Sequence, residues 1–290
     1  MTPTNFPNAR FLCLGKTPVT RDNGVAGVKY LIYNTEHNRY WVTTIPVPRS
    51  IEERNATIER QYNASRTTPS LGQQFNPAWH FPEYEEGWKI CEDPWRSDTF
   101  VKVQHMLERN RWITDYYTAY NCTRKELHNL KRLQGIPQHN NLCEYKGVVT
   151  DQSQTRRVFG IAYEKYDCDL FNWTMDHNKP FDTKLIIEVV GRALQHLHKY
   201  GLVHCDVKPE NVFIKGEGEI LKIALGDFDS MHRVGETLMT KIGTRYFWNE
   251  KYAVGDKAVV ELDIFALGKL KKWLERVEIM RGNRRRRAKH

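Results

Sequence analysis

The feature that most constrains this chain is a pair of short apolar segments beyond its middle. The segments VFI and EILKIAL, residues 212–214 and 219–225, are β-prone and are separated by KGEG, a turn sequence with two glycines. This pattern predicts a β-hairpin. Because a hairpin brings its two open ends together, Asn211, just before the first strand, and Asp227, just after the second, are expected to converge.

Two further polar residues, Asp206 and Lys208, lie on the loop that leads into this hairpin. One small volume would then hold two carboxylates, an ammonium group and an amide. Asn211 and Asp227 are candidate Mg²⁺ ligands, because Mg²⁺ prefers hard oxygen donors. Asp206 is the candidate to orient a substrate hydroxyl and accept its proton. Lys208 is the candidate to offset charge on a transferring phosphoryl group, since this chemistry depends on positioning and electrostatics.

These residues resemble the catalytic machinery of the protein kinase family. The segment HCDVKPEN, residues 204–211, is similar to the kinase catalytic loop, and DFD, residues 227–229, to its metal-binding triplet. The alternative is that these are ordinary turn aspartates, but two motifs at the right separation across a hairpin form a specific signal. A lysine two residues after Asp206 is usual in serine/threonine kinases. The resemblance thus implies an ATP- and Mg²⁺-dependent kinase that acts on serine or threonine hydroxyls of a protein substrate.

The resemblance also assigns roles to two residues upstream. Lys102, in TFVKVQ, resembles the strand lysine that grips the α and β phosphates of ATP, and Glu126, in RKELHNL, would be its partner. Glu126 shares a helical face with Leu130 and Leu133, at i+4 and i+7, so its side chain is expected to point inward. The alternative is a surface glutamate at the edge of the helix.

Further positions follow from the same resemblance. The adenine-binding hinge would run through Glu164 and Tyr166, and Asp169 would approach the ribose or the substrate. The segment GTRYFWNE, residues 243–250, resembles the substrate-docking end of the activation segment. Asp263, in ELDIFALG, resembles the buried aspartate that anchors the catalytic-loop backbone from a central helix.

The resemblance implies an α+β, bilobal protein kinase-like fold with a β-rich N-lobe and a mostly helical, truncated C-lobe. We expect the N-lobe at residues 79–166, the C-lobe at 167–280 and a basic tail at 281–290. Residues 1–78 form an N-terminal extension in this division. Within the extension, GVKYLIYN and RYWVTTIPV predict a hairpin, followed by a short helix and a polar linker.

The clearest helix prediction falls on residues 181–200, which are strongly amphipathic. Asp182 or Thr183 can cap its start, and Gly201 ends it. The apolar residues expected to line one side are Leu185, Val189, Leu194 and Leu197.

Four features depart from the kinase pattern. No G-x-G-x-x-G precedes Lys102, so a phosphate-covering glycine loop is not recognisable. Asp229 replaces the glycine of the metal-binding triplet, which removes backbone freedom and adds a negative charge. Cys205 replaces the arginine that normally pairs with a phosphorylated activation loop, so regulation by that route is not expected. The chain also ends soon after the helix that contains Asp263, so an incomplete lower lobe is expected.

These departures keep two alternatives open. One is a pseudokinase that binds nucleotide or acts as a scaffold without phosphotransfer. The other is a small-molecule phosphotransferase of kinase-like fold, although such enzymes generally lack a lysine at the position of Lys208.

Charge and composition indicate the compartment. The formal net charge is +9, and six lysines and arginines lie after residue 280, so the body is only mildly basic. The run Arg284–Arg287 predicts a nucleic-acid patch or an import-receptor signal, and a solvated end is the alternative. No signal peptide or membrane-spanning run is recognisable, and the six cysteines show no C-x-x-C spacing. We therefore expect an intracellular protein of the cytoplasm or nucleus with no membrane partner.

Overall fold

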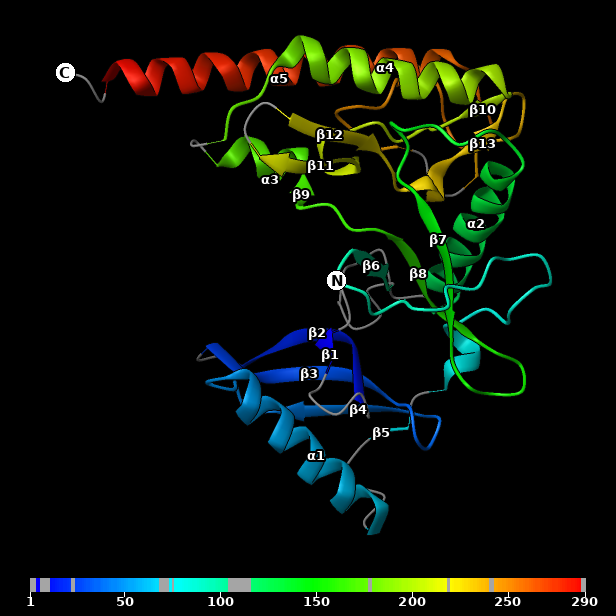
Figure 1. Ribbon diagram of the computed structural model, residues 1–290, viewed down its shortest axis with the longest axis vertical. Helices are drawn as coiled ribbons and strands as arrows, with labels where there is room; N and C mark the ends of the chain where they lie inside the picture. The colour runs from blue at the N-terminus through cyan, green and yellow to red at the C-terminus, as the bar shows by residue number, and fades with distance from the viewer. Residues whose placement is uncertain are drawn as a thin grey trace. The chain divides into compact units, whose positions relative to one another are not determined.

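The computed structural model describes residues 4–5, 11–21, 24–67, 73–74, 76–103, 116–176, 179–217, 220–239 and 243–287 (Figure 1). They belong to two compact units. The first comprises Met1–Arg124 and Tyr145–Tyr163, and the second Lys125–Glu144 and Glu164–His290. Both contain antiparallel strands and helices, so the predicted α+β class is confirmed.

The first unit contains a five-stranded antiparallel sheet and one long helix, α1 (Ile51–Thr67). The strands follow chain order: β1 (Thr4–Asn5), β2 (Phe11–Arg21), β3 (Gly24–Asn34), β4 (Arg39–Ile45) and β5 (Gln73–Gln74). β3 and β4 pair in the register Tyr33–Tyr40, which confirms the predicted hairpin. The predicted short helix is α1, and most of the predicted linker lies outside the described residues.

Both faces of this sheet are covered. Successive side chains of a strand point to opposite faces. Ile32 and Trp41 accordingly pack with Tyr62 of α1 in one cluster. On the other face, Tyr33 packs with Phe159 in a second cluster.

Phe159 belongs to a smaller sheet of the same unit, with strand order β6 (Thr99–Lys102), β8 (Val158–Glu164) and β7 (Tyr145–Thr150). A buried hydrogen bond adds to the packing, because the Tyr40 hydroxyl donates to Asp151, just after β7, at 3.0 Å. The extension is thus part of the same core as the predicted N-lobe strands.

The second unit is built on α4 (Thr183–Lys199) and α5 (Glu261–Arg287), which lie side by side (Figure 1). Val190 and Leu194 of α4 and Leu270 of α5 are fully or almost fully buried in one cluster with the hairpin residues Ile214 and Ile223. The hairpin strands are β11 (Val212–Glu217) and β12 (Ile220–Leu225). The other described elements of this unit are α3 (Leu170–Met175), β9 (Cys168–Asp169), β10 (Leu202–Val203), β13 (His232–Arg233) and the 3₁₀ turns η3 (Pro209–Asn211) and η4 (Phe228–Ser230). Helix α2 (Tyr116–Gln134) begins in the first unit and continues into the second, and the 3₁₀ turn η2 (Pro77–Trp79) belongs to the first unit. Within the described ranges, no helix has the length and apolar character needed to cross a bilayer.

The buried face of helix α4 matches the prediction except at Leu185. Val189, Leu194 and Leu197 are buried as expected, but Leu185 is 39% exposed. The expectation for Leu185 was wrong because Ile186, which is 1% exposed, fills the core position in the first turn.

Asp182 caps α4 by accepting the backbone N–H groups of Lys184 at 2.8 Å and Leu185 at 3.1 Å. Asp182→Ala is expected to lower the free energy of unfolding by about 1 kcal/mol, because it removes an acceptor from the first turn. Urea unfolding measures this change. Glu188→Ala, on the exposed face of the same helix, is the matched control and is expected to change stability by less than about 0.5 kcal/mol. Equal effects of the two variants would contradict the capping role.

Helix α5 includes the first part of the predicted basic tail. Arg281 is only 9% exposed, and its guanidinium donates to the backbone carbonyls of Thr174, Asp176 and Lys179, the last two at 2.7 and 2.8 Å. These carbonyls lie at and beyond the C-terminal end of α3, where helical carbonyls lack intrahelical partners. Arg281 is therefore a structural residue and not part of a solvated tail. The side chains of Arg284–Arg287 lie outside the described residues, so the predicted nucleic-acid or import-receptor contact stays a prediction.

Arg281→Met is expected to lower the free energy of unfolding by about 2–3 kcal/mol, because several buried carbonyls lose a charged donor. Arg281→Lys is expected to restore only part of this, since an ammonium group cannot reproduce the planar fork of the guanidinium. Thermal and urea unfolding measure both. Lys271→Met, at an exposed position of α5, is the control. A loss no larger than in the control would show that the carbonyls do not need Arg281.

Candidate active site

The hairpin positions two of the predicted site residues. Val212 and Leu225 pair at its open end, and the N–H of Gly226 donates to the carbonyl of Asn211 at 2.9 Å. Gly226 has no room for a side chain, because a Cβ there would lie 2.6 Å from Cys143 Sγ. The close pairing explains why Asn211 and Asp227 flank the same end of the hairpin, as its sequence predicts.

Asp206 lies at the centre of a hydrogen-bond network and is 3% exposed. Its Oδ2 atom accepts from Lys208 Nζ at 2.9 Å and from Asn211 Nδ2 at 3.2 Å. Its Oδ1 atom accepts from both the backbone N–H and the hydroxyl of Thr244, each at 2.9 Å. The structure thus brings Asp206, Lys208 and Asn211 together and adds Thr244, which the sequence placed only within a docking segment.

Lys208 connects the catalytic-loop motif to the segment that contains Thr244. Its ammonium donates to Asp206 Oδ2 and, at 2.9 Å, to Thr244 Oγ1. Gly243 permits this close approach, since a Cβ there would lie 2.5 Å from the carbonyl oxygen of Cys205. An ammonium, a carboxylate and a hydroxyl therefore contact one another, an arrangement that can hold a carboxylate in one orientation.

The loop before Asp206 is held from α5 by Asp263, which is 0% exposed. The N–H groups of His204 and Cys205 donate to its two carboxylate oxygens, each at 2.8 Å, and His198 Nε2 lies 2.8 Å from Oδ2. The anchoring contact predicted for Asp263 is confirmed. Cys205 has φ +66°, a left-handed conformation that is unfavourable for a residue with a side chain. The two hydrogen bonds offset this local strain.

Asp227 also has a left-handed backbone, with φ +64°, a conformation that aspartate tolerates better than most residues. Its side chain does not cap the short η4 turn that follows. The amide nitrogen of Asn211 donates to the carbonyl and the carboxylate of Asp206, which leaves the amide oxygen as the atom suited to a metal. A carboxylate and an amide oxygen at one hairpin end fit Mg²⁺.

Asp229 does not adopt a left-handed backbone, so the freedom of the glycine that it replaces is not needed here. It is 6% exposed, and its Oδ1 atom accepts from the hydroxyl of Ser230 at 2.9 Å.

Lys102 and Glu126 belong to different units. Lys102 is half-buried at the end of β6 in the first unit. Glu126, on α2 in the second unit, is 0% exposed, which confirms that it points inward. The pairing of the two side chains stays a prediction.

The three residues predicted near the nucleotide base and ribose have protein partners. Glu164, at the end of β8, pairs with Lys215 at 3.2 Å and with Lys222, and it accepts from the Tyr166 hydroxyl at 3.1 Å. Partial burial raises the pKa of Glu164, but these donors outweigh it and hold the pKa below its usual value. Asp169 caps α3 by accepting the N–H of Asn172 at 2.8 Å. Their nucleotide contacts stay predictions.

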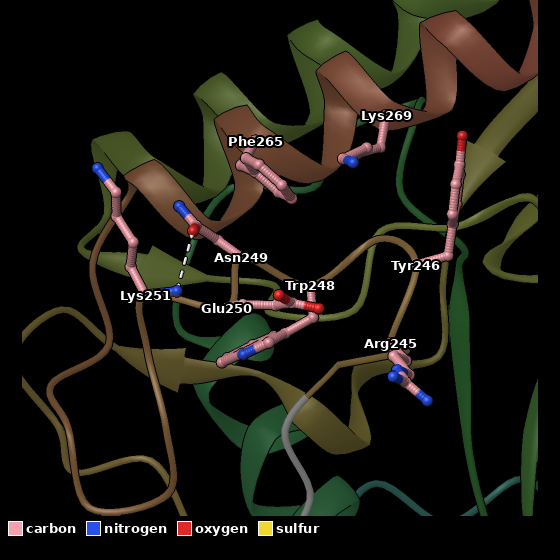
Figure 2. A pocket seen from close by; sticks show the side chains of 8 residues that line it. All are labelled: Arg245, Tyr246, Trp248, Asn249, Glu250, Lys251, Phe265 and Lys269. Carbon is pink, nitrogen blue, oxygen red and sulfur yellow. Dashed lines mark hydrogen bonds between the residues drawn. The ribbon is translucent and has the colours of Figure 1, made fainter.

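A pocket of about 730 Å³ begins directly after Thr244. Figure 2 shows Phe265 and Lys269 projecting from α5 toward the loop that forms the other wall. Its loop residues are Arg245, Tyr246, Trp248, Asn249, Glu250 and Lys251. Lys269 Nζ lies 5.2 Å from the centroid of the Tyr246 ring, within the range of a cation–π contact. The lining is thus aromatic and cationic with one carboxylate, which suits a polypeptide better than an apolar ligand.

Some contacts could not be read from the sequence. His198 is the next-to-last residue of α4, and only its proximity in sequence to the catalytic loop hints at a role. Asn129 and Arg132 of α2 bind the segment after Asp227, and Arg132 pairs with Glu236 at 2.9 Å. The i, i+3 spacing of Asn129 and Arg132 indicates that they share a face of α2, but nothing in the local sequence marks Glu236 as the partner of Arg132.

Comparison with known proteins agrees with this geometry. The family model described as the protein kinase domain matches residues 101–286. The serine/threonine-protein kinase ArnS of Sulfolobus acidocaldarius is 30% identical over 179 residues, which cover 50% of this chain and 28% of that protein. The dual specificity tyrosine-phosphorylation-regulated kinase 2 of Drosophila melanogaster is 23% identical over 177 residues, 60% of this chain and 23% of that protein.

A serine/threonine-protein kinase of Drosophila melanogaster is 30% identical over 88 residues, 30% of this chain and 12% of that protein. The chain therefore spans less than a third of the length of each of these relatives. The family match nevertheless covers well over half of the chain, from β6 to the last turn of α5. With the catalytic-loop network and the hairpin in place, this match shows that the chain belongs to the protein kinase family.

Proposed function

We propose that this chain is an active serine/threonine protein kinase that transfers the γ-phosphate of Mg-ATP to hydroxyl groups of a protein substrate. The observation that carries the proposal is the network around Asp206. Lys208 and Thr244 both contact its carboxylate, and Lys208 also contacts the Thr244 hydroxyl. The lysine at this position favours serine or threonine as the acceptor.

Each residue of the network has a role in this proposal. Asp206 orients the acceptor hydroxyl and takes its proton, and Asp263 keeps the loop backbone beneath it in place. Lys208 offsets negative charge beside the acceptor. Asn211 and Asp227 hold Mg²⁺, which with ATP supplies a phosphoryl group whose charge is partly neutralised. The protein contributes mainly positioning and electrostatics, as phosphoryl transfer requires.

The pocket that begins at Arg245 supports a polypeptide substrate. It follows Thr244 in the chain, and Thr244 touches Asp206, so a bound peptide would reach both its acceptor site and this surface. Arg245, Lys251 and Lys269 outnumber Glu250, which favours acidic residues near the acceptor.

The decisive experiment uses labelled ATP, Mg²⁺ and generic basic and acidic protein substrates, with Asp227→Ala as the matched variant. Labelled phosphoserine or phosphothreonine from the wild-type chain alone would support both the reaction and the metal site. Label on tyrosine alone would contradict the specificity. No transfer by either form would contradict the catalytic proposal.

A pseudokinase is the second candidate, and one local observation favours it. Between residues 76 and 98, the described chain has turns and isolated bridges, Glu83–Arg157 and Ile90–Val148, in place of a paired hairpin with a glycine loop. Calorimetry separates the candidates, because a pseudokinase of this kind would bind Mg-ATP without transferring phosphate. A wild-type chain that turns over ATP onto a protein removes this candidate.

A further inference from the structure

One face of α2 binds the beginning of the segment that follows Asp227, at residues 228–236. Lys125, Asn129 and Arg132 are spaced i, i+4 and i+7, so they lie along one side of the helix. Asn129 is 1% exposed, and its amide nitrogen donates to the carbonyls of Phe228 at 2.8 Å and Met231 at 2.9 Å. The middle of this face is therefore fixed to the η4 turn immediately after the candidate metal ligand.

The strongest contact of this face is an ion pair with two parallel hydrogen bonds. Arg132 donates to the two carboxylate oxygens of Glu236 at 2.9 and 3.0 Å, a bidentate geometry that fixes orientation as well as distance. Glu236 also accepts the N–H of Arg233 at 2.8 Å, and Arg132 contacts Asn129 Oδ1 at 3.2 Å. Partial burial raises the pKa of Glu236, but the Arg132 and Arg233 donors outweigh it and lower the pKa to about 2. The carboxylate is therefore ionised at neutral pH.

A third contact lies at the other end of the face. His232 is 1% exposed, and its Nδ1 atom lies 2.7 Å from the carbonyl of Ser230, so Nδ1 carries the hydrogen. Nε2 is then the acceptor for the ammonium of Lys125, at 3.2 Å. Burial and the nearby Lys125 lower the pKa of His232, which agrees with a neutral ring.

The catalytic-loop position directly before Asp206 carries no cation. The residue before Asp206 is Cys205, which is 4% exposed, and burial raises the pKa of its thiol well above neutrality. A phosphate on the segment would therefore find an uncharged side chain there. Arg132 of α2, meanwhile, is already paired with Glu236.

We infer that the Glu236 carboxylate, through its ion pair with Arg132, holds α2 and the segment after Asp227 in the arrangement that phosphotransfer requires, so that the kinase needs no phosphorylation of this segment. We call this ion pair the latch. The inference rests on the proposed function. Glu236 is a positioning residue, since it acts through Arg132 and α2, the helix that carries the buried Glu126. The side chain supplies permanently the charge that a phosphate would add reversibly.

The first test uses the full chain after exhaustive treatment with a protein phosphatase. The treated wild type is expected to keep its phosphotransfer rate. Glu236→Gln, which has the same shape without the charge, is expected to lower kcat about tenfold, the size of a typical coupling between linked sites, with the unfolding midpoint retained. Exchange of the two charges, Arg132→Glu with Glu236→Arg, is expected to recover most of the loss. Glu188→Gln, an exposed glutamate of α4, is the matched control.

Three results would overturn the latch: loss of wild-type activity after phosphatase treatment, a Glu236→Gln rate within twofold of the wild type, or no recovery in the charge-exchanged pair. Inactivity of the wild type would instead count against the proposed function. In that case hydrogen exchange decides the latch. Amides of residues 125–134 are expected to exchange about tenfold faster in Glu236→Gln, and unchanged exchange would refute it.

Discussion

Asp206→Asn is expected to lower kcat at least about 100-fold, because the amide cannot accept the proton of the acceptor hydroxyl. Whichever way it is turned, its nitrogen would also face a donor, Lys208 on one side or Thr244 on the other. The KM for ATP is expected to change little, since Asn211 and Asp227 remain. Steady-state phosphotransfer with labelled ATP measures both parameters.

The control for this variant is Asp256→Asn. Asp256 is exposed and accepts one backbone N–H, from Ala253 at 2.8 Å, a bond that asparagine can also accept. Its rate is expected to match the wild type. If Asp206→Asn kept more than a tenth of the wild-type kcat, the assignment of Asp206 as the base would be wrong.

Asp263→Ala is expected to have the largest effect on stability. The variant leaves the buried N–H groups of His204 and Cys205 without an acceptor, and each such loss costs about 1–3 kcal/mol. With the His198 contact also gone, the free energy of unfolding is expected to fall by about 3–5 kcal/mol, which is a large part of the stability of most domains. Urea unfolding followed by circular dichroism measures the change.

Asp263→Asn tests the same contact more gently, because its amide oxygen can still accept one of the two N–H groups. It is expected to fold, and to lose phosphotransfer because the Cys205 turn is held from one side only. Glu261→Ala, in the first turn of the same helix and exposed, is the control for helix effects. A similar small loss in Asp263→Ala and Glu261→Ala would show that the loop does not depend on this carboxylate.

The sequence predicted the parts of the fold that short-range patterns determine. The hairpin of β11 and β12 follows from β-prone residues around a glycine turn, and α4 follows from its period, its aspartate cap and Gly201. The anchoring role of Asp263 came from the family resemblance. Local rules could not place Leu185, because Ile186, next to it, is equally apolar and only the packing of α4 decides between them.

Contacts between distant segments were the ones missed. Arg281 was assigned to a tail because arginine runs are usually solvated, yet tertiary contacts with the end of α3 bury it. The pairing of Arg132 with Glu236 joins residues 104 positions apart. A charged side chain in a sequence does not reveal its partner, so only the folded chain identifies such pairs.

The two-sided sheet of the first unit also bears on how the protein can be produced. The family match begins at residue 101, within β6, yet the apolar face that includes Val101 and Phe159 is covered by Tyr33 and Val42 from the extension. A recombinant protein cut to the family boundary would expose this face to water and favour self-association in the expression host. The folding unit therefore includes strands β2, β3 and β4 of the extension, and these strands belong in any protein made for biochemistry or crystallisation.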